Sequence, residues 1–250
     1  MLRAILFDLD DTLIDWGHFF DQWEIVEGQR LRGVYDYISE SVFPLGGLET
    51  YTQEYFKRTR DAWQSARDTL KAPHLGRILC ETAIAMGVPA DRVEQQAYLT
   101  AYKWDAVPGT KVFPDVVEAL TKLRERGLRF GIVTNAFQPM ILRDTELQTH
   151  GLLDFFPQCR FSAADVGYLK PHPDIFATAL ACLGTTPEET VFVGDNPIAD
   201  IAGAQGAGMR AILRRKKQTQ GYRSLLVVPD AVVDSLLEIP AILDKWYGKA

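Results

Sequence analysis

The segment AILFDLDDTL, residues 4–13, joins a short apolar run to three aspartates that stand within four positions. The apolar run at residues 4–6 predicts a short buried strand. Asp8, Asp10 and Asp11 follow this strand, and ligands of open α/β sheets bind just beyond the carboxyl ends of the strands. Because crowded carboxylates repel one another unless a cation offsets them, the segment predicts an acidic ligand site at the end of the first strand.

Composition narrows the class of protein. The 250 residues are 47% hydrophobic and 24% charged, which is enough for a substantial core and close to the size at which chains divide into two domains. The formal net charge of −6 argues against a nucleic-acid or anionic-membrane partner, since both favour a basic face. No apolar run approaches the roughly 20 residues of a membrane helix. Acids follow the start at once, without a small-residue cleavage site, so we predict no signal peptide.

Cysteine usage bears on the compartment. Cys80, Cys159 and Cys182 are odd in number and lack a CxxC spacing. This pattern argues against a disulfide framework or a thiolate zinc site and favours a reducing environment. We therefore expect a cytoplasmic protein, and the sequence leaves open whether it is a monomer or a homodimer.

From about residue 108 onward, predicted strands alternate with predicted helices. Residues 113–127, for example, carry Val116, Leu120 and Leu123 at helical spacing and stop at a glycine. The predicted strands lie at residues 128–135, 159–165, 190–195, 209–215 and 230–235, and the predicted helices at residues 113–127, 140–151, 173–184, 199–208 and 238–246. This alternation predicts an α/β fold, a Rossmann-like doubly wound parallel sheet covered by helices on both faces.

Residues 16–106 break this rhythm. In residues 54–71 the side chains of Phe56, Trp63 and Leu70 share one helical face, and no convincing strand stands in the region. It also holds 14 of the 27 aromatic residues of the chain. We predict a helical cap domain at residues 16–106, inserted into a catalytic core made of residues 1–15 and 107–250.

The first motif, FDLDDTL, supplies a nucleophile and an acid/base. An aspartate can form an aspartyl-phosphate, and Asp8 stands at the strand end. Asp10, two residues on, projects to the same side of an extended backbone, where it could protonate a leaving oxygen and then accept a proton from water. The structural alternative is an acidic turn in which Asp11 and Thr12 cap the following segment.

The second and third motifs supply phosphate ligands. Thr134 and Asn135 in GIVTNA end another predicted strand, where a hydroxyl and an amide could hold phosphate oxygens. Lys170 in LKPHPDIF stands before a predicted helix, and its ammonium could neutralise both a phosphoryl group and Asp8. Taken alone, the second motif favours a polar turn after a strand, and Lys170 favours an ordinary solvated lysine.

The fourth motif, FVGDNPIAD, supplies a second acidic pair. Asp195 ends an apolar strand and could bind magnesium, which prefers oxygen ligands. Asp200 could orient a metal-bound water or Lys170, or it could simply cap the helix. The four motifs together are more informative than each alone, because each one adjoins a predicted strand end and these ends could face one crevice.

In order and over most of the chain, FDLDDTL, VTNA, LKPHPDIF and VGDNPIAD resemble the four motifs of the haloacid dehalogenase superfamily. The helical insertion resembles the cap of the subfamily that includes phosphoglycolate phosphatases and β-phosphoglucomutase. The resemblance implies that Asp8 is the nucleophile and Asp10 the acid/base. It implies a Mg²⁺ ion held by Asp8, the backbone carbonyl of Asp10 and Asp195, with Thr134 and Lys170 contacting the phosphoryl group.

True dehalogenases of this superfamily generally lack the second aspartate and the magnesium, so Asp10 favours the phosphatase branch. The expected activity is magnesium-dependent hydrolysis of a small soluble phosphomonoester: a sugar phosphate, a phosphoglycolate-like acid or a nucleoside monophosphate. A phosphomutase and a phosphonate hydrolase on the same scaffold remain open alternatives. A haloacid dehalogenase and a non-catalytic metabolite-binding protein are less favoured.

The cap residues that would select the substrate are less defined. Three basic residues could favour an acidic leaving group, and four residues after the first motif could pack on a base or sugar; solvation and core packing are the alternatives. A phosphonate hydrolase would also need a Schiff-base lysine in the cap. The three basic candidates are Lys57, Arg58 and Arg60. The four residues after the first motif are Trp16, His18, Phe19 and Phe20. The cap lysines that could form a Schiff base are Lys57, Lys71 and Lys103.

Overall fold

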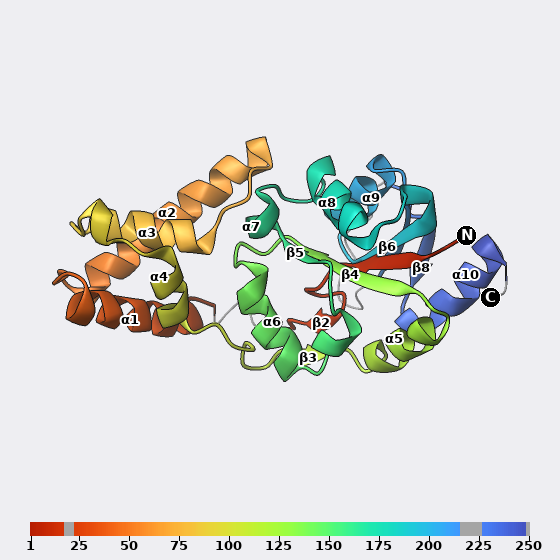
Figure 1. The fold of residues 1–250 in the computed structure, drawn as a ribbon, viewed down its shortest axis with the longest axis horizontal. Helices are drawn as coiled ribbons and strands as arrows, with labels where there is room; N and C mark the ends of the chain where they lie inside the picture. Colours follow the sequence, from red (N-terminus) through yellow and green to blue (C-terminus); the bar gives the residue numbers. More distant parts are fainter. Residues whose placement is uncertain (18–22, 216–226, 249–250) are drawn as a thin grey trace.

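A computed structural model describes residues 1–17, 23–215 and 227–248. Its core is a six-stranded sheet in which every pairing is parallel, in the order β5-β4-β1-β6-β7-β8 (Figure 1). The strands are β1 (Ala4–Phe7), β4 (Arg129–Thr134), β5 (Arg160–Ser162), β6 (Thr190–Gly194), β7 (Arg210–Arg214) and β8 (Ala231–Val233). The predicted α/β fold with a parallel sheet is confirmed.

Helices cover both faces of this sheet. In β1, Ile5 and Phe7 pack toward one face while Ala4 and Leu6 pack toward the other, and all four are fully buried. The first face is covered by α5 (Val116–Glu125), α6 (Met140–Thr149) and α10 (Ile239–Tyr247), the second by α7 (Ala163–Val166), α8 (Pro173–Leu183) and α9 (Gly203–Gly206). A strand buried on both faces reads as a continuous apolar run, which is the pattern of residues 4–7.

Local signals explain where these helices begin and end. Helix α8 starts with Pro173 after His172, whose ring nitrogen accepts a hydrogen bond from the Asp174 N–H, and it ends at Gly184 with φ of 60°. Proline at the first helical position and glycine in the left-handed conformation after the last are favoured at these two ends. Short 3-10 helices lie at Ala90–Arg92, Leu153–Phe155, Pro187–Glu189 and Leu236–Glu238.

The order of the strands creates a crevice at β1. β4, the next strand of this sheet along the chain, lies on one side of β1, and β6 lies on the other side. The loops that follow β4 and β6 therefore diverge at the carboxyl end of β1, and open α/β sheets bind ligands at such a switch point.

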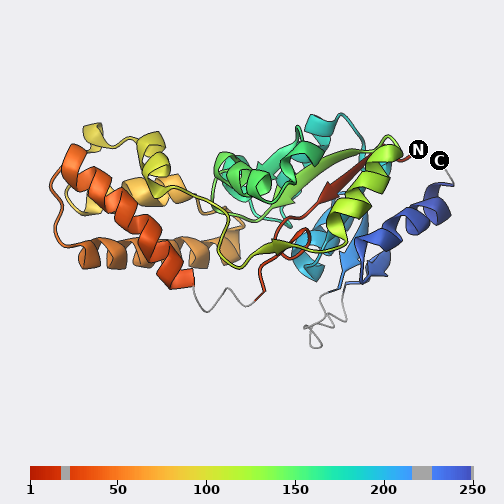
Figure 2. The same ribbon diagram turned by 90° about the horizontal axis from the view of Figure 1, so that it is seen from below.

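The inserted region is helical. It contains α1 (Trp23–Ser41), α2 (Leu48–Thr69), α3 (Leu75–Ala85) and α4 (Gln95–Tyr102). Figures 1 and 2 show this helical cap at the end of the molecule opposite to both termini. The exact cap boundaries of 16–106 stay a prediction, and His18, Phe19 and Phe20 lie outside the described residues.

Two connections tie the cap to the core. The short strands β2 (Ile14–Asp15) and β3 (Lys111–Val112) pair in antiparallel fashion, and they bring together the chain that leaves the core and the chain that returns. After α2, the Leu169 N–H donates to the Leu70 carbonyl and the Ala72 N–H to the Gly167 carbonyl, at 2.8 and 2.9 Å. The cap therefore touches the core through its linkers and through the connection between α2 and α3, where the Leu75 N–H also donates to the Phe137 carbonyl at 2.8 Å.

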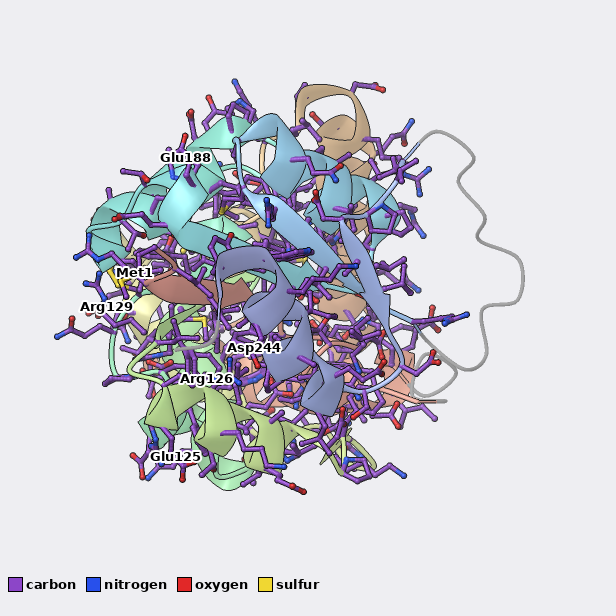
Figure 3. The ribbon with its side chains drawn as sticks, turned by 90° about the vertical axis from the view of Figure 1, so that its right-hand side faces the viewer. Met1, Glu125, Arg126, Arg129, Glu188 and Asp244 are labelled. Carbon is purple, nitrogen blue, oxygen red and sulfur yellow. A yellow bond between two sulfur atoms is a disulfide. The ribbon has the colours of Figure 1, made fainter. Side chains whose placement is uncertain are left out.

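At the opposite end, α10 packs against α5. Arg126 after α5 and Asp244 of α10 form a two-pronged ion pair, with nitrogen–oxygen distances of 2.8 and 3.3 Å (Figure 3). Among the residues that the structure describes, no helix combines the length and the apolar character needed to cross a membrane.

One sequence prediction is wrong. Cys159 and Cys182 form a disulfide, with 5.5 Å between their Cα atoms, whereas Cys80 is a free thiol. The crossover from β5 through α7 to α8 packs the end of α8 beside the start of β5, which spacing along the chain does not reveal. Cysteine usage therefore no longer supports a reducing compartment.

Candidate active site

The four motifs meet at one cavity between the sheet and the cap. The cavity has a volume of about 1210 Å³, and its core side is formed by the loops that follow β1, β4 and β6. Every site residue predicted from the sequence lines it: Asp8, Asp10, Thr134, Asn135, Lys170, Asp195 and Asp200. The predicted convergence of the motifs at the strand ends is thus what the structure contains.

Asp8 lies at the base of the cavity and is only 6% exposed. Its Oδ1 accepts a hydrogen bond from the Lys170 ammonium at 2.6 Å, and its Oδ2 accepts one from the Thr12 hydroxyl at 3.1 Å. Its own backbone N–H donates to the Val193 carbonyl of the neighbouring strand at 2.9 Å. Thr12, which we considered only as a cap of a turn, thus orients the predicted nucleophile.

Burial is the main reason that the pKa of Asp8 lies well above its usual range. The Lys170 ammonium opposes this shift, while the carboxylates of Asp200, Asp195 and Asp10 add to it. The buried Asp8 carboxylate, with other carboxylates close by, favours the binding of a cation, because a cation stabilises its ionised form.

Lys170 is held by three acceptors. In addition to Asp8, its ammonium contacts the Asp200 carboxylate at 2.7 Å and the Val133 carbonyl at 2.7 Å. Burial acts to lower the pKa of Lys170, but Asp200 and Asp8 outweigh it and raise that pKa above its ordinary value. The lysine is therefore a fixed positive charge beside the predicted nucleophile.

The fourth motif holds Asp200 in place through Asn196 and Gly194. The Asn196 side chain caps the π-helical turn η5 (Pro197–Ala202), accepting from the N–H groups of Ile198 and Ala199. Asn196 therefore occupies the capping position considered for Asp200, whose Oδ2 instead accepts from the Asn196 N–H at 2.9 Å. A Cβ added to Gly194 would lie 2.6 Å from the Asp200 Cβ, so only glycine leaves room for this carboxylate.

Three carboxylates form a candidate metal site. One oxygen each from Asp8, Asp195 and Asp200 lies within 4.8 Å of the other two, and carboxylate oxygens are the ligands that Mg²⁺ prefers. The donor chemistry and the crowding at Asp8 both fit a divalent cation. Asp200 lies in this cluster and also contacts the Lys170 ammonium at 2.7 Å, so its predicted role of orienting Lys170 from behind the ligands stays a prediction. Coordination by the Asp10 carbonyl stays a prediction.

The Asp10 carboxylate is bound by residues outside this cluster. It forms a two-pronged ion pair with Arg143 of α6, at 2.5 and 3.3 Å, and its Oδ2 also accepts from the Thr134 hydroxyl at 3.2 Å. We did not single out Arg143 or its neighbour Glu146 from the sequence. A signal existed, because both charges fall with Met140 and Leu147 on the buried face of α6.

Asn135 fastens two loops together. Its amide oxygen accepts from the Lys170 N–H at 2.7 Å, and its amide nitrogen donates to the Lys170 carbonyl at 3.1 Å. The side chain thereby positions the loop that carries the ammonium. Direct contact of Asn135 or Thr134 with phosphate oxygens stays a prediction.

The cap side of the cavity carries aromatic side chains together with polar ones, among them Glu24, Glu27 and Gln53. It is lined by Trp16, Trp23, Tyr55, Phe56, Trp63 and, from the core, Phe137. Of the three basic candidates, only Arg60 lines the cavity; Arg58 pairs with Glu54 at 2.8 Å and Lys57 lies 4.0 Å from the same carboxylate.

Comparison with known proteins shows which family the chain resembles. A family model described as a haloacid dehalogenase-like hydrolase matches residues 2–208. The chain is 30% identical over 243 residues to a glyceraldehyde 3-phosphate phosphatase of Methanopyrus kandleri, covering 96% of each protein. It is 31% identical over 258 residues to the pyrophosphatase PpaX of Bacillus mycoides, covering 99% of each.

Solved structures share the fold. A 2-haloacid dehalogenase from Pseudomonas syringae superposes with a TM-score of 0.65 at 25% identity, covering 98% of this chain and 100% of that one. A phosphatase from Thermococcus onnurineus superposes with a TM-score of 0.60 at 23% identity, covering 99% of each chain. With four motifs at one cavity and a family match over most of its length, this chain belongs to the haloacid dehalogenase-like hydrolases.

Proposed function

We propose that this hydrolase is a magnesium-dependent phosphatase of small phosphomonoesters that works through an aspartyl-phosphate on Asp8. The observation that carries the proposal is the contact of Asp8 with the Lys170 ammonium at 2.6 Å inside a cluster of carboxylates. The names of the phosphatase relatives support the same class of reaction.

In the proposed reaction, an oxygen of Asp8 attacks the phosphorus and the bond to the leaving oxygen breaks. Lys170 offsets the charge of the phosphoryl oxygens and keeps Asp8 oriented. A Mg²⁺ ion held by Asp8, Asp195 and the Asp10 carbonyl would supply further positive charge against these oxygens.

Asp10 moves the protons. It donates one to the leaving oxygen as that bond breaks, and it then accepts one from the water that attacks the aspartyl-phosphate. Inorganic phosphate leaves and Asp8 returns to its first state. The retained Asp10 is also the feature that separates this proposal from a haloacid dehalogenase.

The substrate class follows from the cap side of the cavity. The aromatic residues of this side, with Arg60, Glu24 and Glu27 beside them, favour an organic leaving group that offers both apolar and polar contacts, such as a sugar, a short acid or a nucleoside. The phosphonate hydrolase alternative has no such support, because none of Lys57, Lys71 and Lys103 lines the cavity. The absence of a nucleic-acid or membrane partner stays part of the proposal. A cytoplasmic location stays part of it as well, although the disulfide weighs against that location.

The test is phosphate release from a panel of phosphomonoesters, with magnesium or with a chelator. We expect turnover by the parent only with magnesium, and loss of turnover in Asp8→Asn. Asp11→Asn is the matched control, because asparagine tolerates the positive φ of 61° at this position. Turnover that survives the chelator or Asp8→Asn would contradict the proposal. Conversion of a sugar phosphate into its isomer without phosphate release would favour the phosphomutase alternative.

A further inference from the structure

Arg143 contacts the predicted acid/base from a buried position. Its side chain is 2% exposed, and its Nη2 lies 2.5 Å from the Asp10 Oδ1 while its Nη1 lies 3.3 Å from the Oδ2. A planar guanidinium that meets both oxygens of a carboxylate fixes the rotation of that carboxylate as well as its position. The Asp10 side chain itself is 32% exposed on the cavity side.

Glu146 anchors Arg143 from behind. The Arg143 Nε lies 2.7 Å from the Glu146 Oε2, and the Glu146 side chain is fully buried one helical turn further along α6. The guanidinium therefore spans two carboxylates, one in the core and one at the cavity. A lysine could keep the charge but could not make both contacts with the same geometry.

Two tryptophans flank the guanidinium, one from each cap linker. The Arg143 Cζ lies 5.6 Å from the ring centroid of Trp16, which directly follows β2. It lies 5.5 Å from the ring centroid of Trp104, which stands between α4 and β3. Such cation–π contacts are attractive at distances up to about 6 Å. The position of Arg143 thus depends on both segments that join the cap to the core.

We propose that Arg143 is a positioning residue that holds the Asp10 carboxylate in the orientation needed for proton transfer. The proposal rests on the proposed phosphatase function. Arg143 contacts both oxygens of this carboxylate, and the Thr134 hydroxyl adds a third contact at Oδ2, at 3.2 Å. Arg143 acts through Asp10 and not on the phosphoryl group.

The test compares substrates that differ in their need for an acid. We would measure Arg143→Lys with an alkyl phosphate from the panel and with p-nitrophenyl phosphate, whose leaving group needs little protonation. For the alkyl phosphate we expect kcat to fall roughly 10- to 100-fold. For p-nitrophenyl phosphate we expect the first-turnover release of nitrophenol to change less than about threefold, because Asp8 attack needs no proton from Asp10. Arg126→Lys, at another two-pronged ion pair (Figure 3) whose two residues do not line the cavity, should change neither rate.

A double-mutant cycle tests whether Arg143 works through Asp10. In an Asp10→Asn background, Arg143→Lys should lower kcat further by less than about threefold, since the group it positions is already lost. If Arg143→Lys does not fold, Glu146→Gln replaces it, because it loosens the anchor without removing the guanidinium.

Each other outcome overturns a defined part of the argument. An equal loss for both substrates, or full additivity with Asp10→Asn, would make Arg143 merely structural and overturn the positioning role alone. A folded parent without magnesium-dependent turnover on any phosphomonoester would overturn the proposed function, and the positioning role with it.

Discussion

Asp8, Lys170 and Asp200 form a buried chain of charges in which the ammonium lies 2.6 and 2.7 Å from the two carboxylates. Removing water from such groups costs more free energy than their attraction returns unless each has partners. Here the Thr12 hydroxyl and the Asn196 N–H donate the remaining hydrogen bonds. These three charges are thus preorganised, and we expect them to contribute to the reaction more than to the stability of the fold.

Gly194 offers a residue-scale prediction. We expect Gly194→Ala to displace the Asp200 carboxylate, since the added Cβ would lie 2.6 Å from the Asp200 Cβ, and to lower kcat by about 100-fold through a misplaced Lys170. Phosphate release and thermal unfolding are the measurements. Gly206→Ala is the matched control, because a Cβ there meets nothing within 4 Å. Full activity of folded Gly194→Ala would show that Asp200 tolerates another position.

At the scale of elements, α3 depends on a titratable cap. The His74 ring nitrogen accepts a hydrogen bond from the Arg77 N–H at 3.3 Å at the start of this helix. Burial, and next the charge of Arg77, lower the pKa of His74 below its ordinary value, although Asp165 opposes this. A protonated ring nitrogen could no longer accept the bond.

In the folded state the His74 ring is therefore harder to protonate than in the unfolded chain, where it binds a proton near pH 6.5. The contribution of His74 to stability is complete above that pH and is lost as the pH falls toward the lower folded pKa. We expect the urea midpoint of the parent to fall more between pH 7.5 and 5.5 than that of His74→Asn, because asparagine caps without titrating. Parallel pH profiles of the two proteins would contradict this prediction.

The disulfide ties the edge strand β5 to the end of α8. The two cysteines are 23 residues apart, and closing a loop of this length lowers the entropy of the unfolded chain by the equivalent of about 3 kcal/mol. We expect a reductant to lower the free energy of unfolding of the parent by about that amount. Cys182→Ala should start at the lower value and be insensitive to reductant, whereas Cys80→Ser should respond as the parent does. No effect of reductant on the parent would mean that the bond does not form.

At the scale of the whole molecule, the cavity is shared between the cap and the core. The cap supplies aromatic and some charged residues, and the core supplies the carboxylates and Lys170. The β2–β3 pair and the connection between α2 and α3 join the two parts. A ligand that touches both sides stabilises the arrangement in which they are close.

This geometry predicts a fluorescence response. Trp16, Trp23 and Trp63 line the cavity, so magnesium with beryllofluoride should change tryptophan emission and stabilise the protein by about 2.7 kcal/mol at 100 times Kd. Titration with thermal unfolding is the measurement, and beryllofluoride without magnesium is the control. The Asp8→Asn protein should give neither signal. An equal response without magnesium would argue against a metal at the carboxylate cluster.

Local sequence patterns were sufficient for the architecture and for the motif residues. Residues 4–7 have the continuous apolar pattern of a strand that is buried on both faces. Pro173 and Gly184 mark the two ends of α8. Asp8, Asn135 and Asp195 could be predicted because each directly follows a strand, and parallel strands bring those ends to one edge. Lys170 lies between α7 and α8 and was predicted from its place before a helix. The family resemblance added the roles of Asp8 and Asp10, which spacing alone leaves open.

The sequence by itself determined the parallel sheet, the helical insertion and which polar residues converge, because these depend on periodicity, helix ends and strand order. Only the tertiary structure decided the partners that lie far apart in the chain. Asp10 meets Arg143 across 133 residues, Ile14 pairs with Val112, and Cys159 reaches Cys182 over a helical crossover. Two-residue strands have no periodic signal, and a charge on the buried face of a helix does not reveal its partner. Both pairings are set by how the sheet, the helices and the cap pack in three dimensions.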